Sequence, residues 1–597
     1  MPGFSFYYSP HGIDPQMEKT LDSALQSVRF LAEYKTSSLF SDDKLRLMYC
    51  AYDGYPLFTF EADGLKIFLE GKIYDRDECR LGRFVQDIAT CGLKGGLPDS
   101  EFSSYLDSKL LLCDGDFNLV AIDPANSHFL IINDSFGKLL LYQYRDDDSL
   151  VVSRDIRFIQ KTKSIRDLDS YALAEFLMFK FTLGGKTHLS GVQHLPHGVY
   201  CRNRAGRVPE FRRYTSWDLS ESDFGRSIDR NVEDLVELFL EASENRERHK
   251  NRHISLLGMS GGLDSRCVMG ALEKLNVDYK AVSTINHSRE NLHDVETAAR
   301  VAALYQREFI SWVLNPPALE DYRMLVESRS GLNDCGMAVA LQLYREMLSH
   351  SGWGANFYTG DGGAFIKTPY RISHRIRNEN DLYKYITRSS YFNPEEIEAL
   401  LNISPDQLKS HILEILGSYP GDTWNDKNYH YEIFDRRISF LFEGEERTRL
   451  FFWTVAPFEA QPFIAKALRL PDRFKRNFAF SIKFLERLDK RLLDIPYADL
   501  NANVNSLKAV FKINAKAWLQ NHPALLRIAK TILHPAHYKT GFRPGFHNDV
   551  LEIARSSPVL RECLDCDHLV EMIQGNLDSG RYTALLTILL YSRSLES

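Results

Sequence analysis

The sequence has 597 residues, of which 44% are hydrophobic and 26% charged; this is an ordinary globular composition, and the length allows two to four domains. The 73 basic and 80 acidic residues give a net charge of −7, which argues against a nucleic-acid partner because nucleic-acid-binding proteins usually carry a basic excess. The nine cysteines are too sparse and irregularly spaced for a disulfide framework and indicate reduced thiols in a cytoplasmic protein.

Membrane segments are not expected. The first residues lack the basic stretch and apolar core of a signal peptide. The apolar run at 582–592 has about 11 residues, whereas a membrane-spanning helix needs roughly 20. We therefore predict a cytoplasmic protein with no membrane partner.

The first 215 residues consist mainly of short β-rich runs with turn signals between them. Asp63-Gly64 and the segment 124–126 fall where hairpin turns are expected. Strands this closely spaced favour antiparallel sheets. A helix is predicted at 168–179.

The pattern changes after residue 217 and alternates between helices and strands. Helical spacing is predicted at 228–246, 266–275 and 294–305, and strands at 253–258, 279–284 and 308–314. This alternation predicts a parallel sheet wrapped by helices, followed from about 380 by a helical part. We place the domain boundary between 1–215 and 216–597.

The hexapeptide 260–265 carries the strongest chemical signal. It consists of Ser260, Gly261, Gly262, Leu263, Asp264 and Ser265. Glycines after a buried strand let the backbone turn sharply, so that amide groups of the turn and the next helix point at one anion. Asp264 would repel a bare phosphate and makes sense as a Mg²⁺ ligand. The alternative is an ordinary strand–turn–helix corner.

This hexapeptide resembles the pyrophosphate-binding loop of the ATP pyrophosphatases, and the wider chain resembles the asparagine synthetase family. Further segments similar to that family lie, in the family's order, at 70–74, 116–117, 134–137, 191–198 and 359–363. The resemblance implies an α+β N-terminal nucleophile-type sandwich (a degenerate glutaminase), followed by an α/β ATP-pyrophosphatase domain with a parallel sheet and a helical C-terminal part. The family includes β-lactam synthetases and lasso-peptide cyclases.

Two departures from the family indicate that glutamine hydrolysis is lost. The family's nucleophilic cysteine at position 2 is Pro2 here, and proline supplies no thiol. The position of the family's oxyanion asparagine is Glu70, and a carboxylate cannot stabilise an oxyanion. The β-lactam synthetase branch shares this loss. The amine would then be ammonia, a second substrate, or part of the carboxylate substrate, which would give a lactam or macrolactam.

The resemblance also suggests catalytic residues, with alternatives. Asp361 is a candidate base, although an aspartate in a glycine-rich loop can also simply turn its own backbone. A glutamate near 443–446 is another, represented by Glu446, and the three glutamates there are not distinguished. Lys539 fits the family's late catalytic lysine, with Lys483 as the alternative. The family's aspartate after the second Gly-Gly is Ala364 here, which removes one expected Mg²⁺ ligand.

The resemblance therefore implies an ATP-dependent amide-bond-forming ligase that adenylates a carboxylate and transfers it to an amine. Its cofactors would be ATP and Mg²⁺, the latter on Asp264. Its substrates would be small-molecule or peptide carboxylates and amines, and a homodimer is left open. The implied nucleotide-binding residues are Leu256, Ser260, Gly261, Gly262, Leu263, Asp264, Ser265, Ser283 and Gly360. The alternatives are an ammonia-dependent asparagine synthetase and a catalytically silent nucleotide-binding scaffold.

Overall fold

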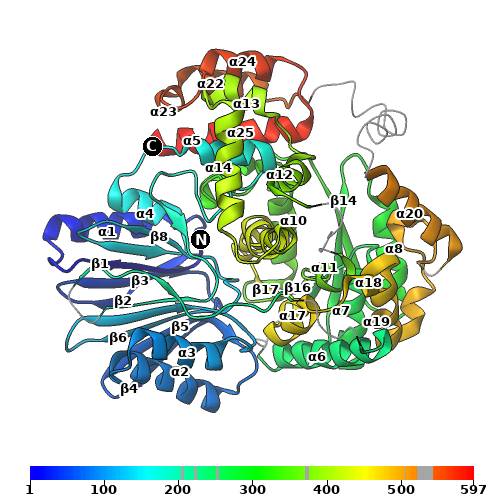
Figure 1. Ribbon diagram of the computed structural model, residues 1–597, viewed down its shortest axis with the longest axis horizontal. Coiled ribbons are helices and arrows are strands. Elements are labelled where there is room, and N and C mark those ends of the chain that lie inside the picture. Colours follow the sequence, from blue (N-terminus) through cyan, green and yellow to red (C-terminus); the bar gives the residue numbers. More distant parts are fainter. Residues whose placement is uncertain are drawn as a thin grey trace.

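A computed structural model shows how these segments fold. It describes residues 1–203, 207–220, 225–249, 254–369, 376–504, 506–520 and 542–596. Antiparallel sheets occupy one side of the molecule, and a parallel sheet with many helices occupies the other (Figure 1). The mixed α/β architecture that the sequence predicts is therefore present.

The N-terminal part contains two antiparallel sheets, each with six described strands. Their orders are β10-β8-β9-β1-β3-β2 and β12-β11-β7-β6-β5-β4. Alternate residues of β1, such as Phe4 and Phe6, bury with Val120 and Ile131 of the other sheet in one core between the two. The strands are β1 (Gly3–Tyr8), β2 (Lys35–Ser41), β3 (Leu45–Ala51), β4 (Leu57–Ala62), β5 (Leu65–Ile73), β6 (Gly115–Asp123), β7 (His128–Asn133), β8 (Tyr142–Arg145), β9 (Leu150–Ser153), β10 (Gln193–His194), β11 (Val199–Asn203) and β12 (Arg212–Arg213).

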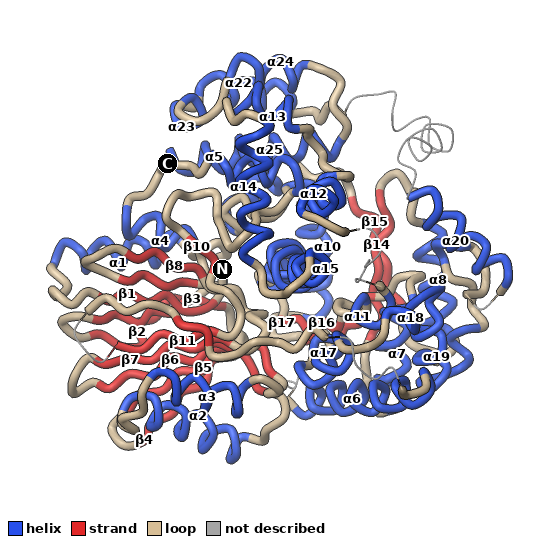
Figure 2. Tube along the Cα trace, in the orientation of Figure 1, coloured by secondary structure: helices blue, strands red, loops and turns tan. Residues whose placement is uncertain are grey.

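Helices cover the outer faces of both sheets (Figure 2). Helices α1 and α4 lie on the first sheet, and α2 and α3 lie on the second. The carboxylates of Asp14, Asp77 and Asp155 accept hydrogen bonds from the first turns of α1, α2 and α4, which fixes where these helices begin. The bounds are α1 (Pro15–Ser27), α2 (Glu78–Leu93), α3 (Asp99–Leu110), α4 (Ile156–Lys163) and α5 (Ser170–Phe179).

The described part of the second half is organised around a five-stranded parallel sheet with the order β15-β14-β13-β16-β17. The central strand β13 pairs with β14 and with β16, so the carboxyl ends of these three strands lie at the same edge. The strands are β13 (Ser255–Gly258), β14 (Lys280–Asn286), β15 (Phe309–Leu314), β16 (Asn356–Tyr358) and β17 (Trp453–Val455). The first helices of this half are α6 (Ile228–Arg248), α7 (Leu263–Lys274) and α8 (Leu292–Ala303).

The remaining described chain is largely helical. The last helices, α22 to α25, gather with α5 and α13, which ties the C-terminus to the N-terminal half (Figure 1). The bounds are α9 (Leu319–Ser328), α10 (Val339–Ser351), α11 (Ala364–Lys367), α12 (Glu379–Thr387), α13 (Pro394–Leu401), α14 (Pro405–Ser418), α15 (Trp424–His430), α16 (Glu443–Arg449), α17 (Gln461–Leu468), α18 (Asp472–Lys475), α19 (Ala479–Asp489), α20 (Leu507–Gln520), α22 (His547–Ser556), α23 (Pro558–Arg561), α24 (Cys566–Gln574) and α25 (Ser579–Glu596).

Two π-helical segments, Tyr431–Asp435 and Arg437–Phe442, join α15 to α16. Such wide turns are rare and rotate the side chains that follow relative to an α-helix. They lead into α16, whose seven residues include six buried polar side chains. The π-helical segment therefore places the charged helix α16 in the interior, between the two halves.

The predicted order of strands and helices from 228 to 314 agrees with the structure to within a few residues. The main difference is that α7 begins at Leu263, so Asp264 and Ser265 lie in its first turn. The sequence analysis missed β16 and β17, which have three residues each. The domain boundary at 215 stays a prediction, and β12 ends just before it, at Arg213. Among the described residues no helix is long and apolar enough to cross a bilayer.

Candidate functional site

Two glycine-rich loops meet at the carboxyl edge of the parallel sheet. The first follows β13, the second follows β16, and these strands are paired neighbours. A Cβ atom added at Gly360 would lie 2.8 Å from the amide nitrogen of Ser265, and one added at Gly363 would lie 2.6 Å from Asp264 Oδ1. Both distances are too short for a side chain, so the close approach requires glycine at these two positions. The sequence predicted both loops, and the structure brings them together.

The first loop is held by its own hydroxyl groups. The Ser265 hydroxyl lies 3.3 Å from the Ser260 hydroxyl and accepts a hydrogen bond from the Ser260 amide. The Ser260 hydroxyl in turn accepts from the Gly262 amide at 3.2 Å. The amide of Gly261 donates to the Asp294 carboxylate, at 2.9 Å. The turn is therefore preformed, and Asp294 occupies one of the amides that the sequence analysis assigned to an anion.

The first turn of α7 offers an anion site. Its N-cap is Gly262, and no described side chain caps the turn. The first amides of a helix have no partner within the helix and carry partial positive charge. They face the second loop, since Gly360 lies against the Ser265 amide. This arrangement suits a phosphate or carboxylate group.

A buried arginine fixes the loop from behind. The Arg266 guanidinium donates to the carbonyls of Gly261, Leu492, Ile495 and Pro496 at 2.7 to 3.0 Å. Burial lowers the pKa of Arg266 to about 10 and outweighs the opposing charge of Asp294. The guanidinium therefore ties the loop to the segment after α19.

The predicted Mg²⁺ site at Asp264 does not fit this geometry. Asp264 Oδ2 forms an ion pair with Lys367 Nζ, at the end of α11. Asp264 Oδ1 lies against the backbone of Gly363. Mg²⁺ requires near-octahedral oxygen ligands and keeps several waters.

Asp361 belongs to the second glycine-rich loop and lies near a pair of buried glutamates. Burial raises the pKa of the Asp361 carboxyl, and the nearby Asp264 carboxylate adds to the rise, while a hydrogen bond from Thr359 and the charges of Arg437 and Arg447 oppose it. An aspartate with a raised pKa can accept a proton closer to neutral pH than a free one. The geometry thus leaves open the predicted role of Asp361 as a base.

Glu445 and Glu459 form the acidic pair beside Asp361. Both side chains are buried, and Glu445 Oε1 and Glu459 Oε1 receive no hydrogen bond from a described donor group. Burial and the neighbouring carboxylate raise the pKa of Glu445 well above its ordinary value, and burial also raises that of Glu459. A proton shared between the two carboxyls would satisfy both oxygens.

The other two glutamates of α16 are also bound by arginines, as Glu445 is by Arg449 at 2.8 Å. Glu443 accepts hydrogen bonds from Arg329 at 3.0 Å. Glu446 binds Arg154 at 2.6 Å and Arg449 at 2.8 Å. Burial alone would raise the pKa of Glu446, but Arg154 and Arg449 together lower it below its ordinary value. The Asp361 carboxylate contributes to the raised pKa of Glu445, so Glu445 joins Glu446 as a candidate base on α16.

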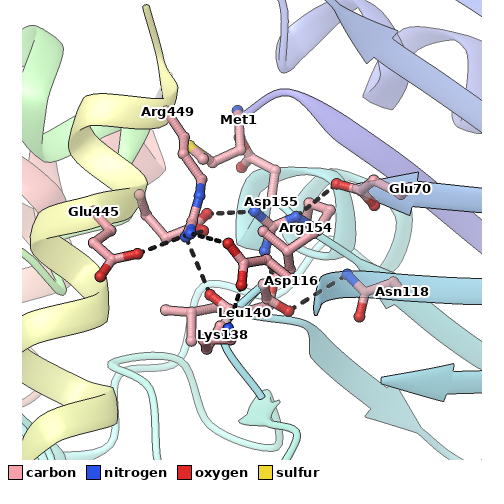
Figure 3. A network of polar contacts seen from close by, with 12 residues as sticks. Met1, Glu70, Asp116, Asn118, Lys138, Leu140, Arg154, Asp155, Glu445 and Arg449 are labelled. Atoms are coloured by element: carbon pink, nitrogen blue, oxygen red, sulfur yellow. Dashed lines mark hydrogen bonds and ion pairs between the residues drawn. The ribbon is translucent and has the colours of Figure 1, made fainter. Parts of the chain in front are cut away.

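Arg154 and Arg449 link this helix to the N-terminal sheets (Figure 3). Arg154 bridges Glu446 and Glu70, with its Nε 2.9 Å from Glu70 Oε1. Tyr55 donates a second hydrogen bond to Glu70 at 2.8 Å. All of these groups are buried. Glu70, for which the sequence analysis expected a position similar to the family's oxyanion asparagine, is therefore a carboxylate paired with Arg154 and Tyr55.

The other predicted residues have simpler surroundings. Leu256 is buried inside the sheet, and Ser283 lies one residue beyond the partner of Gly258 on β14. Lys483 pairs with Asp229 at the surface. Lys539 lies outside the described residues.

Three residues near the site were missed by the sequence analysis. Asp294 follows β14 and could have been found, because carboxyl ends of parallel strands share one edge. Lys367 follows the altered position Ala364 by one helical turn, which is a weak signal. Glu459 follows the unpredicted strand β17, so the sequence contains no signal for it.

The comparisons with known proteins give little guidance. No family model matches the chain, and no curated protein matches it. Glutamine phosphoribosylpyrophosphate amidotransferase from B. subtilis, complexed with ADP and GMP, is 10% identical, with 53% of this chain and 82% of that chain covered at a TM-score of 0.22. A structure of the allosteric regulatory enzyme of purine biosynthesis is 9% identical, with 52% and 80% covered at a TM-score of 0.24. Scores this low carry no argument on function.

Proposed function

We propose that this protein is an ATP-dependent carbon–nitrogen ligase that resembles the asparagine synthetase family and works without glutamine hydrolysis. One observation carries the proposal: the two glycine-rich loops touch through their backbones beside the uncapped first turn of α7. In this proposal 1–215 is a degenerate glutaminase-like domain and 216–597 an ATP-pyrophosphatase-type synthetase domain.

In the first step an oxygen of the substrate carboxylate attacks the α-phosphorus of ATP. The bond from that phosphorus to the bridging oxygen of the β-phosphate breaks, and pyrophosphate leaves. The first amides of α7 and the hydroxyls of Ser260 and Ser265 would hold the departing charge. Mg²⁺ belongs to the proposal as the ion that accompanies the ATP phosphates, where it shields their charge.

In the second step the amine attacks the acyl carbon of the acyl-adenylate. The bond to the AMP oxygen breaks, AMP leaves with that electron pair, and the attacking nitrogen loses a proton. Asp361 is the proposed acceptor, since its raised pKa brings proton uptake closer to neutral pH. The Glu445–Glu459 pair lies next to it and can take up charge by moving its shared proton.

Glu70 indicates that the amine does not come from glutamine hydrolysis. A carboxylate that binds Arg154 and Tyr55 cannot stabilise an oxyanion. We therefore propose that the amine is ammonia, a second substrate, or part of the carboxylate substrate, in which case the product is a lactam or macrolactam.

ATP–pyrophosphate exchange with a panel of candidate carboxylates tests the proposal. Exchange should occur with at least one carboxylate and fall at least tenfold in Asp264→Ala, because this change frees Lys367 from its position beside the α7 amides. Asp278→Ala is the matched control, because Asp278 lies beyond the other end of α7 and its side chain is fully exposed. Exchange that survives Asp264→Ala would count against this site.

A second candidate function is a silent nucleotide-binding scaffold, which the Asp264–Lys367 ion pair and Ala364 favour. Such a protein would bind ATP without exchange. An ammonia-dependent asparagine synthetase would instead convert aspartate and ammonia, and product analysis with those substrates distinguishes it.

A further inference from the structure

We propose that the ammonium group of Lys367, in place of a resident magnesium ion, supplies the positive charge beside Asp264 in the polyphosphate site. This inference rests on the proposed function, because it concerns the same nucleotide site. It starts from an observation independent of any reaction: a lysine and not a second carboxylate faces Asp264 from the neighbouring loop.

The surroundings of Asp264 leave little room for a metal. One carboxylate oxygen binds Lys367 Nζ, and the other faces the Gly363 backbone, where a Cβ would lie only 2.6 Å away. A hydrated Mg²⁺ with ligands at about 2.1 Å would have to displace the lysine. The exposed fractions of the two side chains are 29% for Asp264 and 22% for Lys367, so the pair remains reachable by a ligand.

The charges in the second loop support the same assignment. Compared with a site that has a carboxylate in each loop, Ala364 removes one negative charge, and Lys367 adds one positive charge one turn later on α11. The combined change equals the charge of one magnesium ion. Position 364 thus carries no carboxylate and position 367 carries an ammonium, so the second loop supplies positive charge without a metal.

Lysine is suited to this task. An ammonium is a compact point charge on a flexible stem, and it binds phosphate oxygens well without a fixed geometry. When a polyphosphate occupies the α7 amides, Lys367 need only turn from Asp264 toward the nearest phosphate. Asp264 would then hold the lysine in position in the absence of nucleotide.

The test is calorimetric binding of ATP to the full chain, with excess magnesium and with EDTA. The wild-type dissociation constant should differ little between the two conditions. Lys367→Met keeps most of the stem and should weaken binding in EDTA by about 30-fold, the typical effect of losing a charge-assisted contact. Lys274→Met, an exposed lysine at the end of α7, is the control and should change nothing.

A second variant reverses the charge change. Ala364→Asp combined with Lys367→Met restores a carboxylate in each loop, and an aspartate is favourable at the first position of a helix. ATP binding by this variant should depend on magnesium. Wild-type binding that needs magnesium as strongly as Lys367→Met would overturn the inference while leaving the ligase proposal intact. Absence of ATP binding in both conditions would overturn both, and binding without exchange would overturn only the ligase.

Discussion

The two halves of this protein differ in how completely their buried charged groups are paired. Around Glu70 the buried acidic groups are paired: Glu70 binds Arg154 and Tyr55, and Arg154 continues to Glu446 on α16 (Figure 3). At the glycine-rich loops the first amides of α7 have no described side-chain cap. Arg449 binds one oxygen of Glu445 at 2.8 Å, but Glu445 Oε1 and Glu459 Oε1 receive no hydrogen bond from a described donor. A network in which every group is paired stabilises a structure. Amides without a cap and buried acids with a raised pKa are, by contrast, available to a ligand.

The closed network should be the more sensitive region to a single change. Arg154→Met leaves Glu70 and Glu446 buried without their shared partner and should destabilise the fold by about 3–5 kcal/mol. Differential scanning fluorimetry should show a large fall in Tm, compared with little change for Arg80→Met, whose side chain is exposed. A Tm equal to wild type would mean that water reaches this network.

The loop contact should be the next most sensitive. Gly363→Ala places a Cβ against the Asp264 carboxylate, and overpacking of this kind costs about 1–3 kcal/mol, or roughly 10–100-fold in exchange rate. Gly417→Ala is the control, because a Cβ there meets no atom within 4 Å. Equal exchange in the two variants would show that the loops separate in solution.

The acidic pair predicts a pH effect. Folding raises the pKa of Glu459 above its ordinary value of 4.5. The folded state therefore binds more protons than the unfolded state above about pH 4.5, and stability falls as the pH rises through this window. Glu459→Gln should raise stability near neutral pH by about 1–2 kcal/mol, the cost of an unsatisfied buried group.

The gain from Glu459→Gln should disappear as the pH falls below about 4, where both states of Glu459 are protonated. Tm measured against pH for wild type, Glu459→Gln and the exposed control Glu552→Gln gives the answer. A gain that is the same at every pH would show that packing, and not ionisation, is responsible.

The smallest effect is expected at Lys483. Lys483→Ala removes a partly exposed pair with Asp229, and exposed pairs of this kind contribute at most about 0.5 to 1 kcal/mol. Exchange and amide formation should be unchanged. A tenfold loss of amide formation would identify Lys483 as the catalytic lysine in place of Lys539.

Helices, longer strands and glycine-rich turns could be predicted from the sequence, because local residue patterns encode them. The hexapeptide 260–265 and the order of elements around it follow from periodicity and from glycine placement, and they agree with the structure. The strands β16 and β17 have three residues each, which is too short for alternation to be read. They form strands because the paired neighbours β13 and β16 provide partners.

The charges of the site could not be predicted from local patterns. The three glutamates of α16 have almost the same sequence surroundings, and only the structure separates Glu445 from Glu443 and Glu446. The π-helical turns before α16 rotate the side chains that follow them, and no residue pattern predicts such turns. The pairing of Lys367 with Asp264 joins positions 103 residues apart, so it depends on the two strands being neighbours.

The bridge from Glu70 through Arg154 to Glu446 also constrains how this chain can change over time. If its ancestors hydrolysed glutamine, a return to that activity would need a new cysteine, removal of Glu70, and release of Arg154 from a helix of the other half. Each intermediate would leave a buried ion without its counter-ion. The bridge would therefore make a loss of glutamine hydrolysis hard to reverse, because every path back breaks a buried ion pair. Substitutions in the second half that leave the bridge intact would not meet this barrier.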